Sequence, residues 1–195
     1  NFHNNTFKDV YGENIKLFSL RESIIADNIV TNQVANTTSE GIVIQSTALR
    51  DVIIKGNNIS TYDYALNISN INSDALATVI GMIGTPSLII EGNSFYSENL
   101  ETRLRIAERI IVKNNVFKSH LHINNANNNL KFHNNIFEEG VDFGGTNASQ
   151  NDIEVYDNKI YSTNTDPCLE IESRAASSNV LIASNKFHQT GGGSR

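Results

Sequence analysis

A short motif built around asparagine recurs eight times along the chain and constrains its fold more than any other feature. Each copy has a few alternating apolar residues, two spacers, an Asn, any residue, and then Phe, Ile or Val. The repeated positions are Asn5, Asn28, Asn57, Asn93, Asn115, Asn135, Asn158 and Asn185, which lie 23, 29, 36, 22, 20, 23 and 27 residues apart. Periods of this length with variable insertions are typical of a solenoid, in which coils stack on one another.

The residues around each Asn predict two short strands per coil. The strand before the Asn is β-branched and aliphatic, as in Val52–Ile54, Leu88–Ile90 and Ile110–Val112. A second strand between consecutive motifs has apolar residues two positions apart, which is the period of a strand with one buried face. These pairs are Ile15 and Leu17, Ile42 and Ile44, Leu104 and Ile106, Leu121 and Ile123, Val141 and Phe143, and Leu169 and Ile171.

Asparagine has two properties that suit the repeated position. It tolerates the left-handed backbone of a sharp bend, and its amide both donates to and accepts from an identical amide one coil away. The repeat therefore predicts a stacked Asn ladder. The apolar residue two places after each Asn should point inward and form a second column of Phe, Ile and Val.

These eight repeats, from Phe2 to about Gln189, resemble the right-handed parallel β-helix of the pectate lyase and polygalacturonase superfamily, which also includes phage tailspikes. We therefore expect an all-β, right-handed parallel β-helix of about eight coils with an Asn ladder. It should form a single domain over residues 1–189, cut from a longer chain, with 190–195 as a linker. The superfamily contains lyases, hydrolases, epimerases, esterases and adhesins, so the resemblance does not choose an activity.

Composition excludes several classes of protein. With 15 Lys and Arg against 21 Asp and Glu, the net charge is −6, and no basic stripe exists to neutralise a nucleic acid. The sequence contains no run of 18 apolar residues, so it predicts no membrane span. The lone Cys cannot form an internal disulfide, and the spacing of Cys and His matches no zinc-site pattern, so we expect no structural metal. The resemblance implies an extracellular protein or one on a virion or cell surface.

The long interval between Asn57 and Asn93 leaves two registers open. In one register residues 60–77 bulge outward and Val79–Met82 forms the strand; in the other Ala65–Ile68 is the strand and the bulge follows it. The distance from strand to Asn favours the first. Tyr62 and Tyr64 would then lie in a loop beside the outer face, where they either stack on sugar rings or pack the loop onto the coil below.

The outward residues of the second strand form a column that predicts a candidate site. Read coil by coil, the column is Lys16, Val43, Gly81, Arg105, His122, Asp142 and Glu170, with Glu172 one step further out. Asp142 and Glu170 on adjacent coils would have carboxyls roughly 5 to 6 Å apart, a spacing that suits paired acid and nucleophile in glycoside cleavage, each raising the pKa of the other. His122 would relay a proton, and Arg105 would bind a substrate carboxylate.

Two functions fit this pattern. The first is recognition, and depolymerisation by hydrolysis or elimination, of an extended polysaccharide on the outer face; a lyase would in addition use calcium held by Asp142, Glu170 and Glu172. The alternative is a non-catalytic receptor-binding or shaft segment of a tailspike or adhesin, in which the charged column is an ordinary solvated surface. The uncapped apolar ends of the solenoid favour this alternative, and we expect them to be completed by a longer shaft, in a homotrimer or by end-to-end packing.

Overall fold

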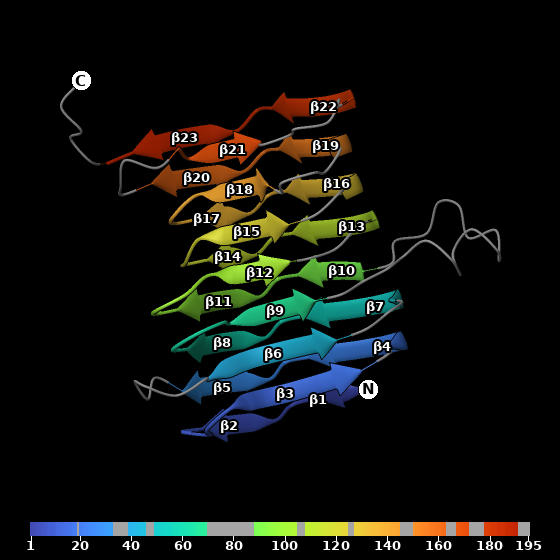
Figure 1. Cartoon of the computed structure of the whole chain (residues 1–195), viewed down its shortest axis with the longest axis vertical. Helices are drawn as coiled ribbons and strands as arrows, with labels where there is room; N and C mark the ends of the chain where they lie inside the picture. Colours follow the sequence, from blue (N-terminus) through green and yellow to red (C-terminus); the bar gives the residue numbers. More distant parts are fainter. Residues whose placement is uncertain are drawn as a thin grey trace.

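The computed structural model describes residues 1–18, 20–32, 39–45, 49–69, 88–104, 108–124, 127–144, 150–162, 167–171 and 178–190. Within these ranges the regular elements are 23 β-strands, which form three long sheets that run side by side along the molecule (Figure 1). Over the same ranges, no helix has the length and apolar character needed to cross a membrane.

Three sheets of parallel strands make up the fold, and we call them sheets A, B and C. Sheet A contains β1 (Phe2–His3), β4 (Arg21–Ala26), β7 (Arg50–Lys55), β10 (Leu88–Glu91), β13 (Glu108–Lys113), β16 (Asn127–His133), β19 (Gln150–Tyr156) and β22 (Ser178–Ala183). Sheet B contains β2 (Thr6–Lys8), β5 (Ile29–Asn32), β8 (Asn58–Thr61), β11 (Ser94–Ser97), β14 (Val116–Phe117), β17 (Ile136–Phe137), β20 (Lys159–Ser162) and β23 (Lys186–Gln189). Sheet C contains β3 (Glu13–Phe18), β6 (Glu40–Gln45), β9 (Leu66–Ser69), β12 (Thr102–Leu104), β15 (Leu121–Asn124), β18 (Val141–Gly144) and β21 (Leu169–Ile171).

The chain visits the sheets in the order A, B, C and then returns to A one coil further on. Each strand consequently pairs in parallel with the strand three places later in the sequence, for example β12 with β15 and β15 with β18. Continuous parallel stacking of this kind is a parallel β-helix, and the predicted fold class is confirmed.

The interior is filled by the inward residues of all three sheets, stacked coil upon coil. The rings of Phe95 and Phe117 lie 5.5 Å apart and those of Phe117 and Phe137 lie 5.2 Å apart, so three successive coils share one aromatic column. All three side chains are fully buried. This is the apolar column predicted two residues after each Asn, and it aligns the coils because like side chains stack on like.

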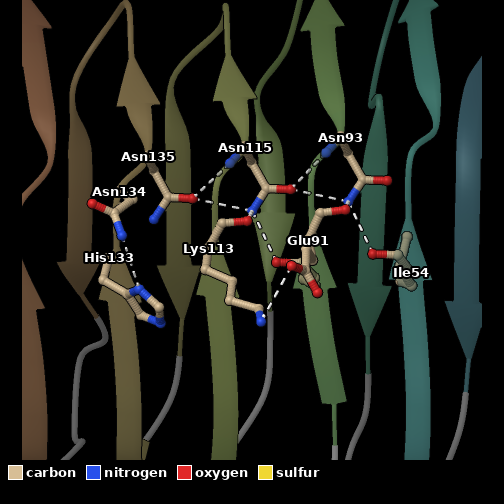
Figure 2. A network of polar contacts seen from close by, with 9 residues as sticks. Ile54, Glu91, Asn93, Lys113, Asn115, His133, Asn134 and Asn135 are labelled. Atoms are coloured by element: carbon tan, nitrogen blue, oxygen red, sulfur yellow. Dashed lines mark hydrogen bonds and ion pairs between the residues drawn. The ribbon is translucent and has the colours of Figure 1, made fainter.

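The predicted Asn ladder is present in all eight coils. Each side-chain amide from Asn5 to Asn158 donates to the Oδ1 of the ladder Asn in the next coil, with Nδ2 to Oδ1 distances of 2.9 to 3.1 Å. Figure 2 shows the central part, in which Asn115 lies between Asn93 and Asn135. The same Oδ1 atoms also accept the backbone N–H of the preceding ladder residue, as Asn115 does for Asn93 at 2.9 Å.

The ladder Asn residues do not themselves adopt the left-handed backbone that was predicted for them. The left-handed backbone belongs to the residue before each ladder Asn, with φ between 54° and 66° in all eight coils. These positions are Asn4, Asp27, Gly56, Gly92, Asn114, Asn134, Asp157 and Ser184. The ladder Asn is therefore selected for its amide hydrogen bonds, and the preceding position for its tolerance of positive φ.

The register of the long coil is the second of the two alternatives. Strand β9 pairs with β6 and β12, with Asn67 opposite both Val43 and Arg103. Asn67 thus takes the column position that was assigned to Gly81. The extra residues follow β9, and Val79–Met82 lies outside the described residues, as do residues 70–77 of the expected bulge. Tyr62 and Tyr64 instead belong to the short connection between β8 and β9.

The outward column of sheet A is built from contacts between neighbouring side chains. Lys113 Nζ lies 3.2 Å from Glu91 Oε1 (Figure 2), and the rings of His133 and Tyr156 are parallel with centroids 5.0 Å apart. Ion pairs and ring stacking between neighbouring coils are typical of a structural surface.

Candidate functional site on the outer face of sheet C

The candidate site is the outward column of sheet C, where one side chain per coil projects away from the core. Pairing of the strands places Asn67, Arg103, His122, Asp142 and Glu170 in register on five consecutive coils. With strands about 4.8 Å apart, these five positions extend over about 19 Å. The sequence-predicted residues His122, Asp142 and Glu170 are therefore direct neighbours.

Arg103 occupies the column position that was assigned to Arg105. In β12 the inward residues are Thr102 and Leu104, both buried, so Arg103 between them faces outward. The prediction counted only apolar residues and paired Leu104 with Ile106, which moved the register by two positions. Arg105 itself lies outside the described residues, and so does Glu172.

Asp142 accepts contacts from two histidines at the centre of the column. His122 Nδ1 lies 2.6 Å from Asp142 Oδ1 and 2.7 Å from Oδ2, and His120 Nε2 lies 3.5 Å from Oδ1. All three side chains are half-buried. One ring nitrogen of each histidine and a carboxylate oxygen of Asp142 lie within 4.8 Å of one another. We call His120, His122 and Asp142 the His–Asp cluster.

His120 lies in this cluster because residues two positions apart on a strand share one face. His120 directly precedes β15 and is two positions before His122, so both side chains lie on the same face. Its backbone is held because Thr102 N–H donates to the His120 carbonyl at 2.9 Å. Its ring is held by a contact of 3.0 Å between Nδ1 and the carbonyl oxygen of Glu139.

The turn beside His120 requires glycine at position 140. Gly140 has φ of +85°, and a Cβ at this position would lie 3.1 Å from the carbonyl oxygen of Pro167 and 3.7 Å from His120 Nδ1. A side chain here would be strained by the backbone and crowded by the next coil. The turn at Gly140 thus permits the Glu139 carbonyl to reach the imidazole.

The cluster holds opposite charges together. Burial by itself raises the pKa of Asp142, but hydrogen bonds and charges from His120 and His122 outweigh it and lower the pKa to about 2. Burial likewise lowers the pKa of His120, but the bonds to Asp142 and to the Glu139 carbonyl, with the charge of nearby Glu101, raise the pKa to about 9. The expectation of a raised pKa at Asp142 is wrong, because the hydrogen bonds and charges of the two histidines lower it.

Arg103 and Tyr64 form a second group of contacts beside the cluster. The guanidinium of Arg103 lies 4.7 Å from the centroid of the Tyr64 ring, and it donates to Glu101 Oε1 from two nitrogens at 2.7 and 3.0 Å. Tyr64 thus supports Arg103 rather than presenting both faces of its ring to solvent. Tyr62 is half-buried and is anchored through its backbone, whose N–H donates to Ser39 Oγ at 3.0 Å.

The stability of this arrangement should depend on pH in a defined way in the metal-free protein. The lowered pKa of Asp142 contributes stability above its ordinary value of 3.8, which is lost as the pH falls toward about 2. The raised pKa of His120 contributes stability below its ordinary value of 6.5, which is lost as the pH rises through about 9. Both contributions to the free energy of unfolding are fully present only between about pH 4 and 6.5.

We therefore expect Asp142→Asn to lower the free energy of unfolding by about 1 to 2 kcal/mol at pH 5.5. This figure allows for the screening of half-buried charges by solvent. At pH 9.5 the difference between the variant and the wild type should be smaller, because the charge on His120 is then lost. Urea unfolding at the two pH values measures both differences. Equal differences at pH 5.5 and 9.5 would contradict this account.

One residue of the site was missed by sequence reasoning. The alternation was read only from the first apolar residue of each strand, Leu121 in this case, so His120 was not counted. The spacing of two between His120 and His122, on a strand paired with an outward carboxylate, was the signal that could have found it.

The chain was compared with protein-family models, with curated proteins and with solved structures, and none of the three comparisons gave a match. The parallel β-helix is consequently established by the strand pairing of this chain alone.

Proposed function

We propose that the outer face of sheet C binds an extended polysaccharide and that the His122–Asp142 pair transfers protons in its cleavage. The observation that carries this proposal is the contact of 2.6 Å between His122 Nδ1 and Asp142 on an outward column. An ionised carboxylate can only accept hydrogen bonds, so Nδ1 carries the hydrogen and Nε2 of a neutral His122 is left as a base. Pairs of this kind orient an imidazole for general acid–base catalysis.

The neighbouring residues support a role for this face in binding. Arg103 and Glu170 flank the pair, one coil before and one coil after it, and Glu170 is exposed. A guanidinium and a carboxylate bind the hydroxyl and carboxylate groups of sugars through charge-assisted hydrogen bonds. Glu170 is also the second group that exchanges a proton with the substrate in this proposal. Each of the five coils from Asn67 to Glu170 contributes one polar residue, and this arrangement matches a polymer because both repeat along a single axis.

We also propose that the chain belongs to the superfamily of pectate lyases, polygalacturonases and tailspikes. It also places the protein outside the cell or on a cell or virion surface, where such polymers occur. The cluster suits calcium poorly, because Asp142 is directed at two imidazoles and calcium prefers oxygen ligands.

A non-catalytic receptor-binding or shaft segment is the second candidate, and one observation favours it. Arg103 is engaged by Glu101 and Tyr64 within the protein, and Lys16 further along the column is paired with Glu13 at 2.6 Å. Side chains that are already paired within the molecule are typical of a structural surface.

The two candidates are separated by testing the chain with a panel of bacterial and plant polysaccharides. Binding is measured by retardation in a gel that contains the polymer, and cleavage by new reducing ends or by the absorbance of an unsaturated product. We expect one class of polymer both to retard the protein and to be shortened. Retardation without cleavage would favour the second candidate, and neither effect with any polymer would contradict the polysaccharide proposal.

A further inference from the structure

We propose that the His–Asp cluster binds a divalent transition metal ion, with Zn²⁺ as the best fit, through His120 Nε2, His122 Nδ1 and a carboxylate oxygen of Asp142. Two imidazole nitrogens and one carboxylate oxygen are a donor set that favours Zn²⁺ and its neighbours over calcium or magnesium. Three protein ligands also leave a fourth tetrahedral position for water.

The distances within the cluster are close to those that such a site needs. Ligand atoms around a tetrahedral zinc ion, each about 2.1 Å from the metal, are separated by about 3.4 Å. His120 Nε2 and Asp142 Oδ1 are 3.5 Å apart, and the three donor atoms lie within 4.8 Å of one another. His122 Nδ1 and Asp142 Oδ1, now at a hydrogen-bond distance of 2.6 Å, need to separate by less than 1 Å.

The backbone fixes the positions from which these ligands come. His122 and Asp142 are direct partners in the pairing of β15 with β18, and His120 is tied to the neighbouring coils by its own carbonyl and by Leu121 N–H, which donates to the Gly140 carbonyl at 3.3 Å. The β-helix therefore holds the three ligands, on and directly before two adjacent strands, in place before any metal arrives, which reduces the ordering that binding requires.

The contact of His120 with Glu139 selects the nitrogen that faces the metal. A carbonyl oxygen only accepts, so Nδ1 of His120 carries the hydrogen, and Nε2 is the nitrogen directed at Asp142. Metal-bound histidines are commonly oriented in this way, by donation of the second ring N–H to a carbonyl or carboxylate. In the described part of the chain, this cluster is the only group of three such residues whose donor atoms come this close.

Metal binding and the proton transfer proposed above are alternative states of one cluster. The metal would take His122 Nδ1 and the carboxylate that otherwise orients this ring, and the displaced protons would pass to solvent or to His122 Nε2. The inference does not require the polysaccharide proposal, because metal binding is measured without any sugar and either result can fail alone.

The test is titration of the full chain, free of affinity tags and stripped with a chelator, with Zn²⁺ by calorimetry and with Co²⁺ by visible absorption. We expect one saturable Zn²⁺ per chain and a Co²⁺ spectrum of low coordination number. His120→Ala and Asp142→Asn should each weaken Zn²⁺ binding by about tenfold or more. The matched control is His133→Ala on sheet A, which should bind as the wild type does.

Circular dichroism and thermal melting of each variant confirm that it is folded before titration. If Asp142→Asn does not fold, His120→Gln carries the same test, since His120 is about one-third exposed. The proposal is overturned if the wild type shows no saturable one-to-one binding. It is equally overturned if the cluster variants bind Zn²⁺ as tightly as His133→Ala does, because the ion would then lie elsewhere.

Discussion

Replacing Asn115 by alanine is expected to lower the free energy of unfolding by about 3 kcal/mol, since it removes the centre of a buried hydrogen-bond ladder. Asn115 Oδ1 accepts from the backbone N–H and the side-chain amide of Asn93, both at 2.9 Å. Its Nδ2 donates to the carbonyls of Ile90 and Lys113, both at 2.9 Å, and to Asn135 Oδ1 at 3.1 Å. Alanine leaves several of these buried groups without a partner.

Two further variants separate hydrogen bonding from loss of volume. Asn115→Asp keeps the shape and the acceptor for Asn93, but it replaces the three contacts made by the two N–H groups of the amide with contacts between oxygens, so it should also destabilise by several kcal/mol. Asn58→Ala is the matched control, because Asn58 follows a ladder position but its side chain is exposed; we expect a change within about 0.5 kcal/mol.

Urea unfolding followed by circular dichroism gives all three values. If Asn115→Ala matches Asn58→Ala in its midpoint, the ladder does not stabilise the fold and the repeat has another cause. If only Asn115→Ala is destabilised and Asn115→Asp is not, the loss is due to a cavity rather than to the hydrogen bonds.

The ladder and the aromatic column could be predicted from the sequence because each coil repeats the same chemistry at the same place. A residue at the wrong position would leave its amide or its ring without a partner in two neighbouring coils. Eight copies therefore specify the position of Asn115 independently of the length of the connections. That is why insertions between Asn57 and Asn93 did not disturb the prediction of the fold.

The errors in register had two causes, a buried polar residue in one strand and two competing apolar segments in the long coil. Thr102 is fully buried in β12, but an alternation counted on apolar residues passes over it and starts at Leu104. In the long coil two apolar segments satisfied the same pattern, and the pairing of β9 with β6 and β12 decided between them. The alternation of residues along a strand predicts the face on which each side chain lies. The pairing of residues between adjacent strands depends on contacts with the neighbouring coil.

The chemistry of the candidate site was less predictable than its position. Alternation placed His122, Asp142 and Glu170 on one face, but it did not show which of them would be in contact. The pKa of Asp142 depends on the orientation of two imidazole rings, and the orientation of His120 depends on the carbonyl of Glu139 in the next coil. Such contacts follow from the folded coils and are not encoded in spacing alone.

Asp142→Asn is expected to reduce polysaccharide cleavage by about a hundredfold or more, the usual share of general acid–base catalysis. The neutral amide cannot stabilise a positive charge on His122, and if its NH₂ faces Nδ1 it moves the ring hydrogen to Nε2 and removes the base. Because Asp142 acts through His122, kcat should fall while KM changes little. Asp142→Glu should recover part of the activity, which a merely structural role would not require.

Glu170→Gln separates activity from stability at the same site. Its side chain is exposed, so the free energy of unfolding should stay within about 0.5 kcal/mol of the wild type while cleavage falls by about a hundredfold. The matched control is Glu154→Gln on sheet A, where the carboxylate lies 2.9 Å from Lys131 Nζ and faces outward on a different sheet. This control should cleave as the wild type does. Wild-type rates in both Asp142→Asn and Glu170→Gln, with cleavage present, would place the reacting groups elsewhere and leave the outer face of sheet C as a binding or structural surface.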